Sequence, residues 1–253
     1  MNRTPPVPVR RALRQEVGFG CPVQDCGNPY LSWHHFDPPW SEREHHDPPG
    51  MIALCAEHHS KADAGAFDKE QLRQLKRDPF AKGRAVKGRF DWLRNELLLV
   101  VGGMFYLRTP IAVQVGGRPI VSTTRDSDGH ALLNVNMLST SGRPRMVMVE
   151  SYWLSHGEPD DLECPPNGRL VAASYPGGDL LRVEFFKLAD AAAVRERYPD
   201  ASWPLPVPIN AVEIRMRVGG TEIDFGPRES RLPGGNIFPN GLIRDCPVGL
   251  AIQ

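Results

Sequence analysis

Four residues near the start of the chain have the types and spacing of a metal site. Cys21 and Cys26 are separated by four residues, and Cys55 and His58 by two. Thiolate sulfur and imidazole nitrogen are common zinc ligands, and two such pairs on tight turns can complete a tetrahedron. The odd count of 5 cysteines disfavours a framework of disulfides. We therefore expect a structural Zn²⁺ ion that holds a small module together.

Three histidines close to these ligands remain for other chemistry: His34, His35 and His59. Neighbouring side chains of a strand point to opposite faces, so His34 and His35 would lie at different angles. His58 and His59 would project about 100° apart on a helix and could serve two different metals. This arrangement favours a second metal site beside the zinc. The alternative is that His34 and His35 only make hydrogen bonds beside a structural zinc.

A helix, two strands and two further helices are expected to position these side chains. Val9, Leu13 and Val17 lie four residues apart and form one apolar stripe of a helix. At the start of the last helix, Asp68 can cap the amide of Gln71. The expected spans are a helix over 8–17, strands over 30–36 and 51–55, and helices over 56–65 and 68–78.

The order of strand, loop, strand and helix, with metal ligands and other histidines interleaved, resembles the HNH endonuclease family. Members of that family carry a ββα-metal motif, and the similarity is to the zinc-stabilised bacterial type. The resemblance covers about residues 8–78. The segments that carry it are Trp33-His34-His35-Phe36 and Ile52-Ala53-Leu54-Cys55-Ala56-Glu57-His58-His59.

The resemblance implies a role for each of the three histidines. His35 would be the general base, its other nitrogen held by a backbone carbonyl. His34 and His59 would hold a catalytic divalent ion such as Mg²⁺, Mn²⁺, Ni²⁺ or Zn²⁺. Gly50 stands where the family has an asparagine that braces the loop. Three polar residues of the same loop could take over that bracing or add a ligand: His45, His46 and Asp47.

The implied activity is metal-dependent hydrolysis of phosphodiester bonds in nucleic acid, with DNA as the expected substrate. A neutral imidazole can take a proton from water near physiological pH. One rival is a zinc-stabilised module that binds nucleic acid but has lost catalysis. Another is an assembly protein in which the second half of the chain does the main work.

Two basic segments are candidates for contacts with phosphate. Residues 76–94 contain seven basic and two acidic side chains, which suggests a basic linker or docking arm. We take three of them as nucleic-acid-binding candidates: Arg84, Lys87 and Arg89. In the first helix three arginines lie off the apolar stripe, either as a solvated basic face or as phosphate contacts: Arg10, Arg11 and Arg14.

The chain from about residue 97 onward alternates short β-rich runs with glycine turns, as antiparallel hairpins do. Strands are expected over 97–108, 111–121, 131–137, 146–153, 170–175, 180–186 and 212–218, and a helix over 188–198. The expected fold is therefore α+β: a zinc-stabilised module over 1–78, a basic linker over 79–96 and a mostly antiparallel β domain over 97–253. That domain is expected to be a sandwich or a barrel, with a β-solenoid as an alternative.

The β-rich half has no motif that predicts catalysis. Asp126, Asp128 and His130 are close in sequence, but an Asp-Gly pair among polar residues is typical of a turn. From residue 96 onward there are 15 basic and 18 acidic residues, which does not favour a large phosphate-binding face. This half could select a target, bind a protein partner or join two copies of the chain.

The composition of the whole chain sets wider limits. Lys plus Arg number 30, as do Asp plus Glu, so any contact with nucleic acid must depend on local charge. No apolar run approaches the roughly 18 residues of a membrane span. The N-terminal residues lack the apolar stretch of a secretory signal. We therefore expect a cytoplasmic protein without a membrane partner.

Overall fold

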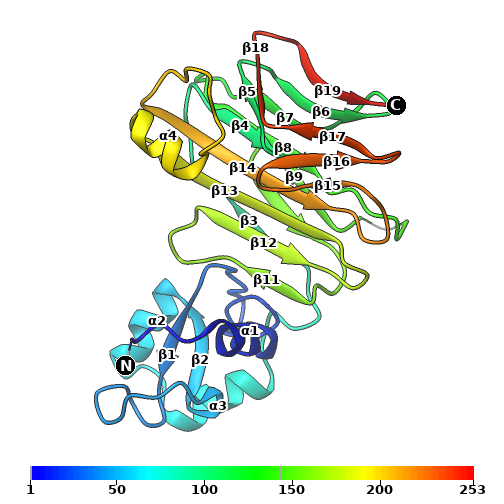
Figure 1. Ribbon diagram of the computed structural model, residues 1–253. Helices are drawn as coiled ribbons and strands as arrows, with labels where there is room; N and C mark the ends of the chain where they lie inside the picture. The colour runs from blue at the N-terminus through cyan, green and yellow to red at the C-terminus, as the bar shows by residue number, and fades with distance from the viewer. Residues whose placement is uncertain (1, 143) are drawn as a thin grey trace.

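The computed structural model describes residues 2–142 and 144–253, which form an α+β structure with mostly antiparallel sheets. Figure 1 shows helices and a short hairpin at one end, and a larger body of strands at the other. We call residues 2–78 the N-terminal module and residues 86–252 the β unit. The elements of the module are α1 (Val7–Glu16), β1 (Leu31–His35), η1 (Pro48–Gly50), β2 (Met51–Cys55), α2 (Ala56–Asp63) and α3 (Lys69–Arg77).

The hairpin of β1 and β2 forms the centre of the N-terminal module. The strands pair antiparallel, with His34 opposite Ile52 and His35 opposite Met51. All five residues of β2 are buried, and they share a core with Leu13 of α1 and with Val17, which follows that helix. Burial of these side chains supports the helix and both strands together. The expected helix and strand spans of the module are thus confirmed to within about two residues.

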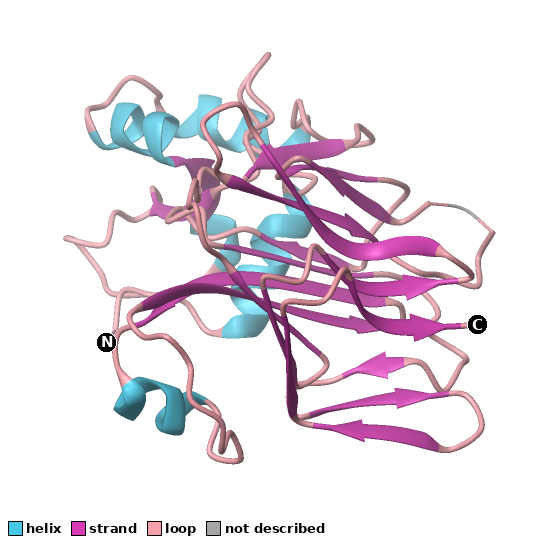
Figure 2. Ribbon diagram, turned by 90° about the horizontal axis from the view of Figure 1, so that it is seen from above, coloured by secondary structure: helices cyan, strands magenta, loops and turns pink. Residues whose placement is uncertain are grey.

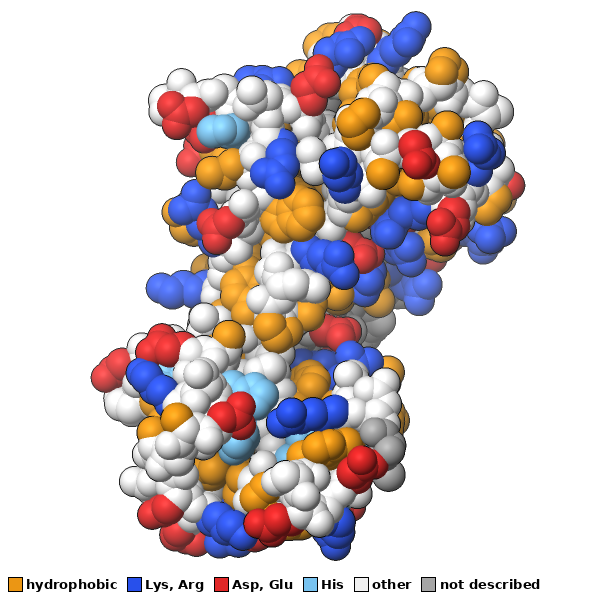
Figure 3. Space-filling model, turned by 90° about the vertical axis from the view of Figure 1, so that its left-hand side faces the viewer, with side chains coloured by type: hydrophobic (Ala, Val, Ile, Leu, Met, Phe, Trp, Pro, Cys, Tyr) orange, Lys and Arg blue, Asp and Glu red, His pale blue; other side chains and the backbone are white. Residues whose placement is uncertain are grey.

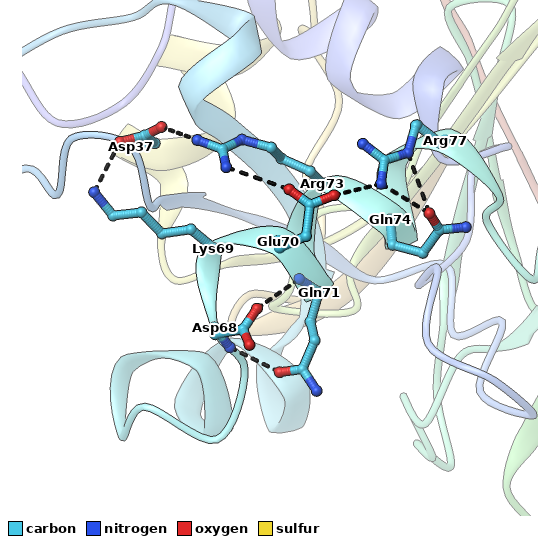
Figure 4. A network of polar contacts seen from close by, with 8 residues as sticks. All are labelled: Asp37, Asp68, Lys69, Glu70, Gln71, Arg73, Gln74 and Arg77. Atoms are coloured by element: carbon cyan, nitrogen blue, oxygen red, sulfur yellow. Dashed lines mark hydrogen bonds and ion pairs between the residues drawn. The ribbon is translucent and has the colours of Figure 1, made fainter.

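Helix α3 is held at its start and tied to the loop after β1 (Figure 4). Asp68 accepts a hydrogen bond from the amide of Gln71 at 2.7 Å, and the Gln71 side chain accepts one from the Asp68 amide at 2.8 Å. The expected cap is therefore confirmed, as a complete capping box. The carboxylate of Asp37 pairs with Lys69 at 2.8 Å and also with Arg73.

Lys76 joins three parts of the module, although it belongs to the segment that was expected to be a linker or docking arm. Its ammonium group donates to the carbonyl of Met51 at 2.7 Å and pairs with Glu16 at 3.1 Å. The side chain is 13% exposed. Lys76 is thus part of the structure of the module, and its charge is already compensated there.

The β unit consists of two sheets. One has the order β19-β6-β7-β8-β9-β10-β3, and the other contains the run β11-β12-β13-β14-β15-β16-β17 with β4, β5 and β18 beside it. The bounds are β3 (Val86–Arg89), β4 (Leu98–Val101), β5 (Met104–Leu107), β6 (Ile111–Val115), β7 (Arg118–Arg125), β8 (Ala131–Asn136), β9 (Met146–Val149), β10 (Tyr152–Ser155), β11 (Asp161–Glu163), β12 (Leu170–Ser174), β13 (Leu180–Leu188), β14 (Ile209–Arg217), β15 (Asp224–Phe225), β16 (Glu229–Leu232), β17 (Asn236–Pro239), β18 (Gly241–Arg244) and β19 (Val248–Ile252).

The two sheets share one apolar core, as a sandwich does. Val121 and Leu133 come from the first sheet, Val183 and Val212 from the second, and all four belong to the same buried cluster. The strands lie in layers in the view from above (Figure 2). A second cluster lies beneath α4 (Ala191–Arg197).

Two alternatives that the sequence left open for this half are excluded. Over the residues described, both sheets are open, so the β unit is no closed barrel. The glycine-rich end is no solenoid, because β16 and β17 extend the second sheet while β18 and β19 pair in parallel with β5 and β6. The C-terminal strands therefore complete both sheets of the sandwich.

The segment expected to be a linker contains an edge strand. Residues 86–89 form β3, which pairs antiparallel with β10, so that Arg89 lies opposite Tyr152. Val86 and Phe90 are buried in the core of the sandwich. The sequence did not indicate that Val86 and Phe90 are buried, because most residues around them are basic.

The arginines of α1 bind the β unit. Arg14 is 2% exposed and makes two hydrogen bonds to Asp161 of β11, at 2.9 and 2.6 Å. Arg10 reaches Glu163 of the same strand at 3.4 Å. For Arg14 both alternatives, solvation and phosphate contact, were wrong, because its partner lies 147 residues away in the chain.

Over the described residues, no helix has the length and apolarity needed to cross a membrane.

Candidate metal centres and the histidine cavity

The three cysteines and one histidine that were expected to bind zinc lie close together. Their ligand atoms all lie within 4.8 Å of one another. The sulfur of Cys55 lies 3.8 Å from that of Cys26 and 3.3 Å from Nδ1 of His58. Nδ1 of His58 is 3.4 Å from the sulfur of Cys21. The loop after α1 and the junction of β2 with α2 thus bring both pairs to one point.

These distances fit four ligands of a tetrahedrally coordinated ion better than they fit a disulfide. Zinc–sulfur bonds of about 2.3 Å give a tetrahedron with sulfur–sulfur edges near 3.8 Å. A disulfide would require about 2.05 Å between the sulfurs of Cys26 and Cys55. Burial raises the pKa of the Cys21 thiol and, to a lesser extent, that of Cys26. A bound cation would reverse that effect, since it favours the thiolate form.

A second group of donors forms where β1 meets α2: His34, His59 and Asp63, also within 4.8 Å of one another. Nδ1 of His34 lies 3.1 Å from one carboxylate oxygen of Asp63, and Nε2 of His59 lies 3.7 Å from the other. The two imidazole rings meet edge to face, with centroids 5.2 Å apart. The expected convergence of His34 and His59 is thus present in the geometry.

The protonation of His59 is set by a neighbour on β1. The hydroxyl of Ser32 donates to the carbonyl of Leu54 at 3.2 Å, which leaves its oxygen to accept from Nδ1 of His59 at 2.7 Å. Nε2 of His59 then carries the lone pair, and this atom faces Asp63. Hydrogen bonds of this kind orient metal-binding imidazoles in many proteins.

Among the described residues, Nε2 of His59 has no partner within hydrogen-bond distance, and the backbone of His45 accounts for only one ring nitrogen of the nearby His35. A buried polar atom without a partner costs free energy, so such atoms point to a missing ligand. Desolvation lowers the pKa of His34 and of His59. Both imidazoles are therefore neutral near pH 7 and can donate lone pairs to a cation. Two imidazoles and one carboxylate suit a divalent transition metal.

His34, His35 and Asp63 line one cavity, which has a volume of about 380 Å³. Its other lining residues are Arg3, Phe36, Pro39, Trp40, Ser41, Ala62, Phe67, Lys69 and Leu72. The ring of His35 packs against that of Trp40, with centroids 4.7 Å apart. Burial lowers the pKa of His35 to about 4. The space-filling view shows histidine side chains at the surface of this end of the molecule, beside charged ones (Figure 3).

The backbone of His45 accepts a hydrogen bond from the ring of His35, which partly opposes the lowering of the His35 pKa. The side chain of His45 also braces the loop. Its Nε2 donates to the carbonyl of Pro38 at 2.9 Å, and its Nδ1 accepts from the amide of Asp47 at 3.1 Å. The ring of His45 lies edge to face against that of His35, with centroids 5.2 Å apart. Position 45 was among the bracing candidates proposed from the sequence.

Gly50 lies where no larger residue fits. A Cβ atom there would come within 2.0 Å of the carbonyl oxygen of Asp37 and 3.0 Å of the ring of His45. The carbonyl of Gly50 also accepts the amides of Phe36 and Asp37, at 2.9 and 3.2 Å. This close approach explains why the chain has glycine and not asparagine at this position.

The basic residues proposed for nucleic-acid binding do not line the cavity. The guanidinium of Arg84 packs over the ring of Phe80 at 4.1 Å. Arg89 packs over Tyr152 at 4.7 Å and donates to its hydroxyl at 2.7 Å. Lys87 is exposed on β3. All three belong to the outside of the molecule near the junction, apart from the histidines.

Asp63 and Ser32 are the site residues that the sequence analysis missed. Asp63 follows His59 by four residues, so both lie on one face of α2. That spacing was the available signal. The cluster of Asp126, Asp128 and His130 was expected to be a turn. Its donors do lie together, but the Asp126 carboxylate already binds the amides of Asp128 and His130.

Comparisons with family models, curated proteins and solved structures found no match. Any assignment of function must therefore come from the geometry of the chain itself.

Proposed function

We propose that this chain is a metal-dependent endonuclease that hydrolyses phosphodiester bonds in nucleic acid, with DNA as the expected substrate. In this proposal Cys21, Cys26, Cys55 and His58 hold a structural Zn²⁺ ion. His34, His59 and Asp63 hold a catalytic divalent ion, and His35 is the general base. The N-terminal module is then a zinc-stabilised ββα-metal module of the HNH type.

One observation carries the proposal: two of the grouped metal donors, His34 and Asp63, line one cavity together with the imidazole of His35. The donors are separate from the cysteine cluster, although His58 and His59 are neighbours on α2. A structural zinc alone would not require three further histidines near it, which are His34, His35 and His59. A reaction that needs both a cation and a proton acceptor accounts for both features.

In this proposal His35 accepts a proton from an attacking water molecule. Because its pKa is lowered to about 4, the ring is neutral near pH 7 and has a lone pair. As the water oxygen bonds to phosphorus, its proton passes to the imidazole. The ester bond to the leaving oxygen breaks, and that oxygen takes a proton from solvent. When bound, a divalent cation would supply positive charge that stabilises the phosphate and the leaving oxygen.

The direct test is the nicking of supercoiled plasmid by the purified chain with Mg²⁺, Mn²⁺, Ni²⁺ or Zn²⁺ added in turn. We expect nicking with at least one of these ions and none without added metal. His34→Ala should reduce nicking by a factor of about 100 or more, because it removes a ligand of the ion. The proposal fails if the folded chain nicks DNA with no ion in the series.

A second candidate is a module that binds nucleic acid without cutting it. The observation that favours it is Gly50, since the backbone there has no room for the asparagine of active HNH nucleases. Such a chain would bind a DNA duplex with an affinity that falls as salt rises. It would leave the duplex intact with every ion tried.

A further inference from the structure

The segment that precedes α1 covers one side of the histidine cavity. Arg3 lines the cavity with His34, His35 and Asp63. The carbonyl of Asn2 accepts a hydrogen bond from Nε2 of His46 at 3.0 Å. Two residues after Arg3, Pro5 is buried. Arg3 is therefore held between two fixed points and is not the end of a loose tail.

Arg3 differs from the other cation of the cavity in having no partner. Lys69 is paired with Asp37 at 2.8 Å. The guanidinium of Arg3 makes no hydrogen bond or ion pair with any other residue in 2–142 or 144–253. Its positive charge also helps to lower the pKa values of His34 and His35, which places it close to both rings. The cavity thus has one uncompensated cation beside a group of metal donors.

We propose that Arg3 binds a phosphodiester group of the nucleic acid and holds it against the histidine cavity. A guanidinium presents a planar pair of donors that matches two phosphate oxygens. The sequence pattern did not indicate this residue, because Arg3 stands alone and outside the segment that resembles HNH nucleases. The inference rests on the proposed function, since it assigns the phosphate to the substrate of that same site.

Binding of a short fluorescent DNA duplex, measured by anisotropy without added divalent ions, tests Arg3 apart from catalysis. Any affinity tag belongs at the C-terminus, so that the first residues stay as they are. We expect Arg3→Ala to weaken binding about fivefold to tenfold and to lower the slope of log affinity against log salt by about 1. Arg3→Lys should keep the slope and recover only part of the affinity, because an ammonium group lacks the planar fork.

Arg118→Ala is the matched control, since it removes one exposed arginine from the β unit, away from the cavity. Its affinity and slope should equal those of the parent. If Arg3→Ala also equals the parent, or if both variants weaken binding equally, the inference is wrong. If the parent cuts DNA and Arg3→Ala binds and cuts it equally well, the role of Arg3 is refuted but the proposed function stands. A parent that neither binds nor cuts refutes the proposed function and Arg3 with it.

Discussion

Two adjacent histidines of β1 have different surroundings, which fits the different roles that we propose for them. His34 meets Asp63 and the ring of His59. His35 packs against Trp40 and His45. The alternation of a strand turns the two rings apart, and the cavity at the end of the strand is lined by both. One short strand can thus supply a metal ligand and a proton acceptor.

A substitution at Gly50 tests the close approach between the backbone of Gly50 and the carbonyl of Asp37. Gly50→Ala should destabilise the module by about 1–3 kcal/mol, because the new Cβ would press on the carbonyl of Asp37. Urea unfolding followed by circular dichroism measures this. Gly65→Ala is a control for loss of a glycine. A Cβ there has open space, so only the cost of its positive φ, 79°, remains. Equal stability of Gly50→Ala and the parent would contradict the close approach.

The sequence was a good guide to residues whose type and spacing restrict their chemistry. Cys21, Cys26, Cys55 and His58 stand out because pairs of soft ligands at short spacing are rare. Asp63 was missed because a lone carboxylate on an exposed helix is ordinary until His34 is seen beside it. Arg3 could not be recognised at all, since its place depends on how the N-terminal segment is pinned by His46.

At the scale of elements, the pairing of α1 with β11 joins the two halves of the chain. Arg14 forms the buried pair with Asp161, with side chains 3% and 22% exposed. A double-mutant cycle on Arg14→Ala and Asp161→Ala should give a coupling energy of about 1–3 kcal/mol, because the pair is largely shielded from water. The control pair Glu57 and Lys61 is 69% and 51% exposed. Its coupling should stay below about 0.5 kcal/mol, and equal couplings would contradict a buried junction.

A second inter-element contact predicts a pH dependence. Asp179 is 3% exposed, and although burial alone would raise its pKa, hydrogen bonds from Ser139, the amide of Gly219 and Arg145 lower it below the usual value. A lowered folded-state pKa gives stability that is present above the unfolded value, near 3.8, and is lost as pH falls through the folded value.

Asp179→Asn should therefore destabilise the chain by about 1–3 kcal/mol near pH 7, and by less near pH 3, which lies below the unfolded pKa. Chemical denaturation at both pH values measures the difference. Equal destabilisation at the two pH values would show that the ionised Asp179 carboxylate does not stabilise the fold. Asp128→Asn is a control, since Asp128 is an exposed carboxylate of a turn.

Elements with clear periodicity were predictable, and elements set by distant partners were not. The spans of β2 and α3 follow from an apolar run and a capping signal. Strand β3 was not predicted, because the basic residues around Val86 are typical of a linker. Only the pairing of β3 with β10 shows that Val86 faces a core. Arg14 of α1 was misjudged for the same reason, since its partner lies on β11.

At the scale of the whole molecule, the module and the sandwich have separate cores. The core of the module is small, so its stability should depend on the cysteine cluster. Removal of metal by a strong chelator should open the module to protease while the β unit resists digestion. Limited proteolysis with mass spectrometry gives the cleavage sites. Cuts spread evenly over both parts would contradict a module stabilised by metal.

The zinc content of a cysteine variant tests the same site without a chelator. Cys21→Ser should lose about one zinc per chain and become sensitive to protease without a chelator. Cys246→Ser is the control, because Cys246 lies in the β unit apart from the cluster. We expect it to keep the metal content of the parent. A parent without bound zinc, after purification without chelators, would refute the structural site.

The central claim, a nuclease with His35 as its base, is tested most directly by the rate of DNA cleavage by His35→Ala. The measurement is single-turnover cleavage of a labelled duplex with the ion that best supports the parent, at matched zinc content. We predict a loss of about 100-fold or more, with unchanged duplex affinity, because the variant lacks the proton acceptor but keeps the metal donors. Cleavage by His35→Ala at the rate of the parent would contradict the account.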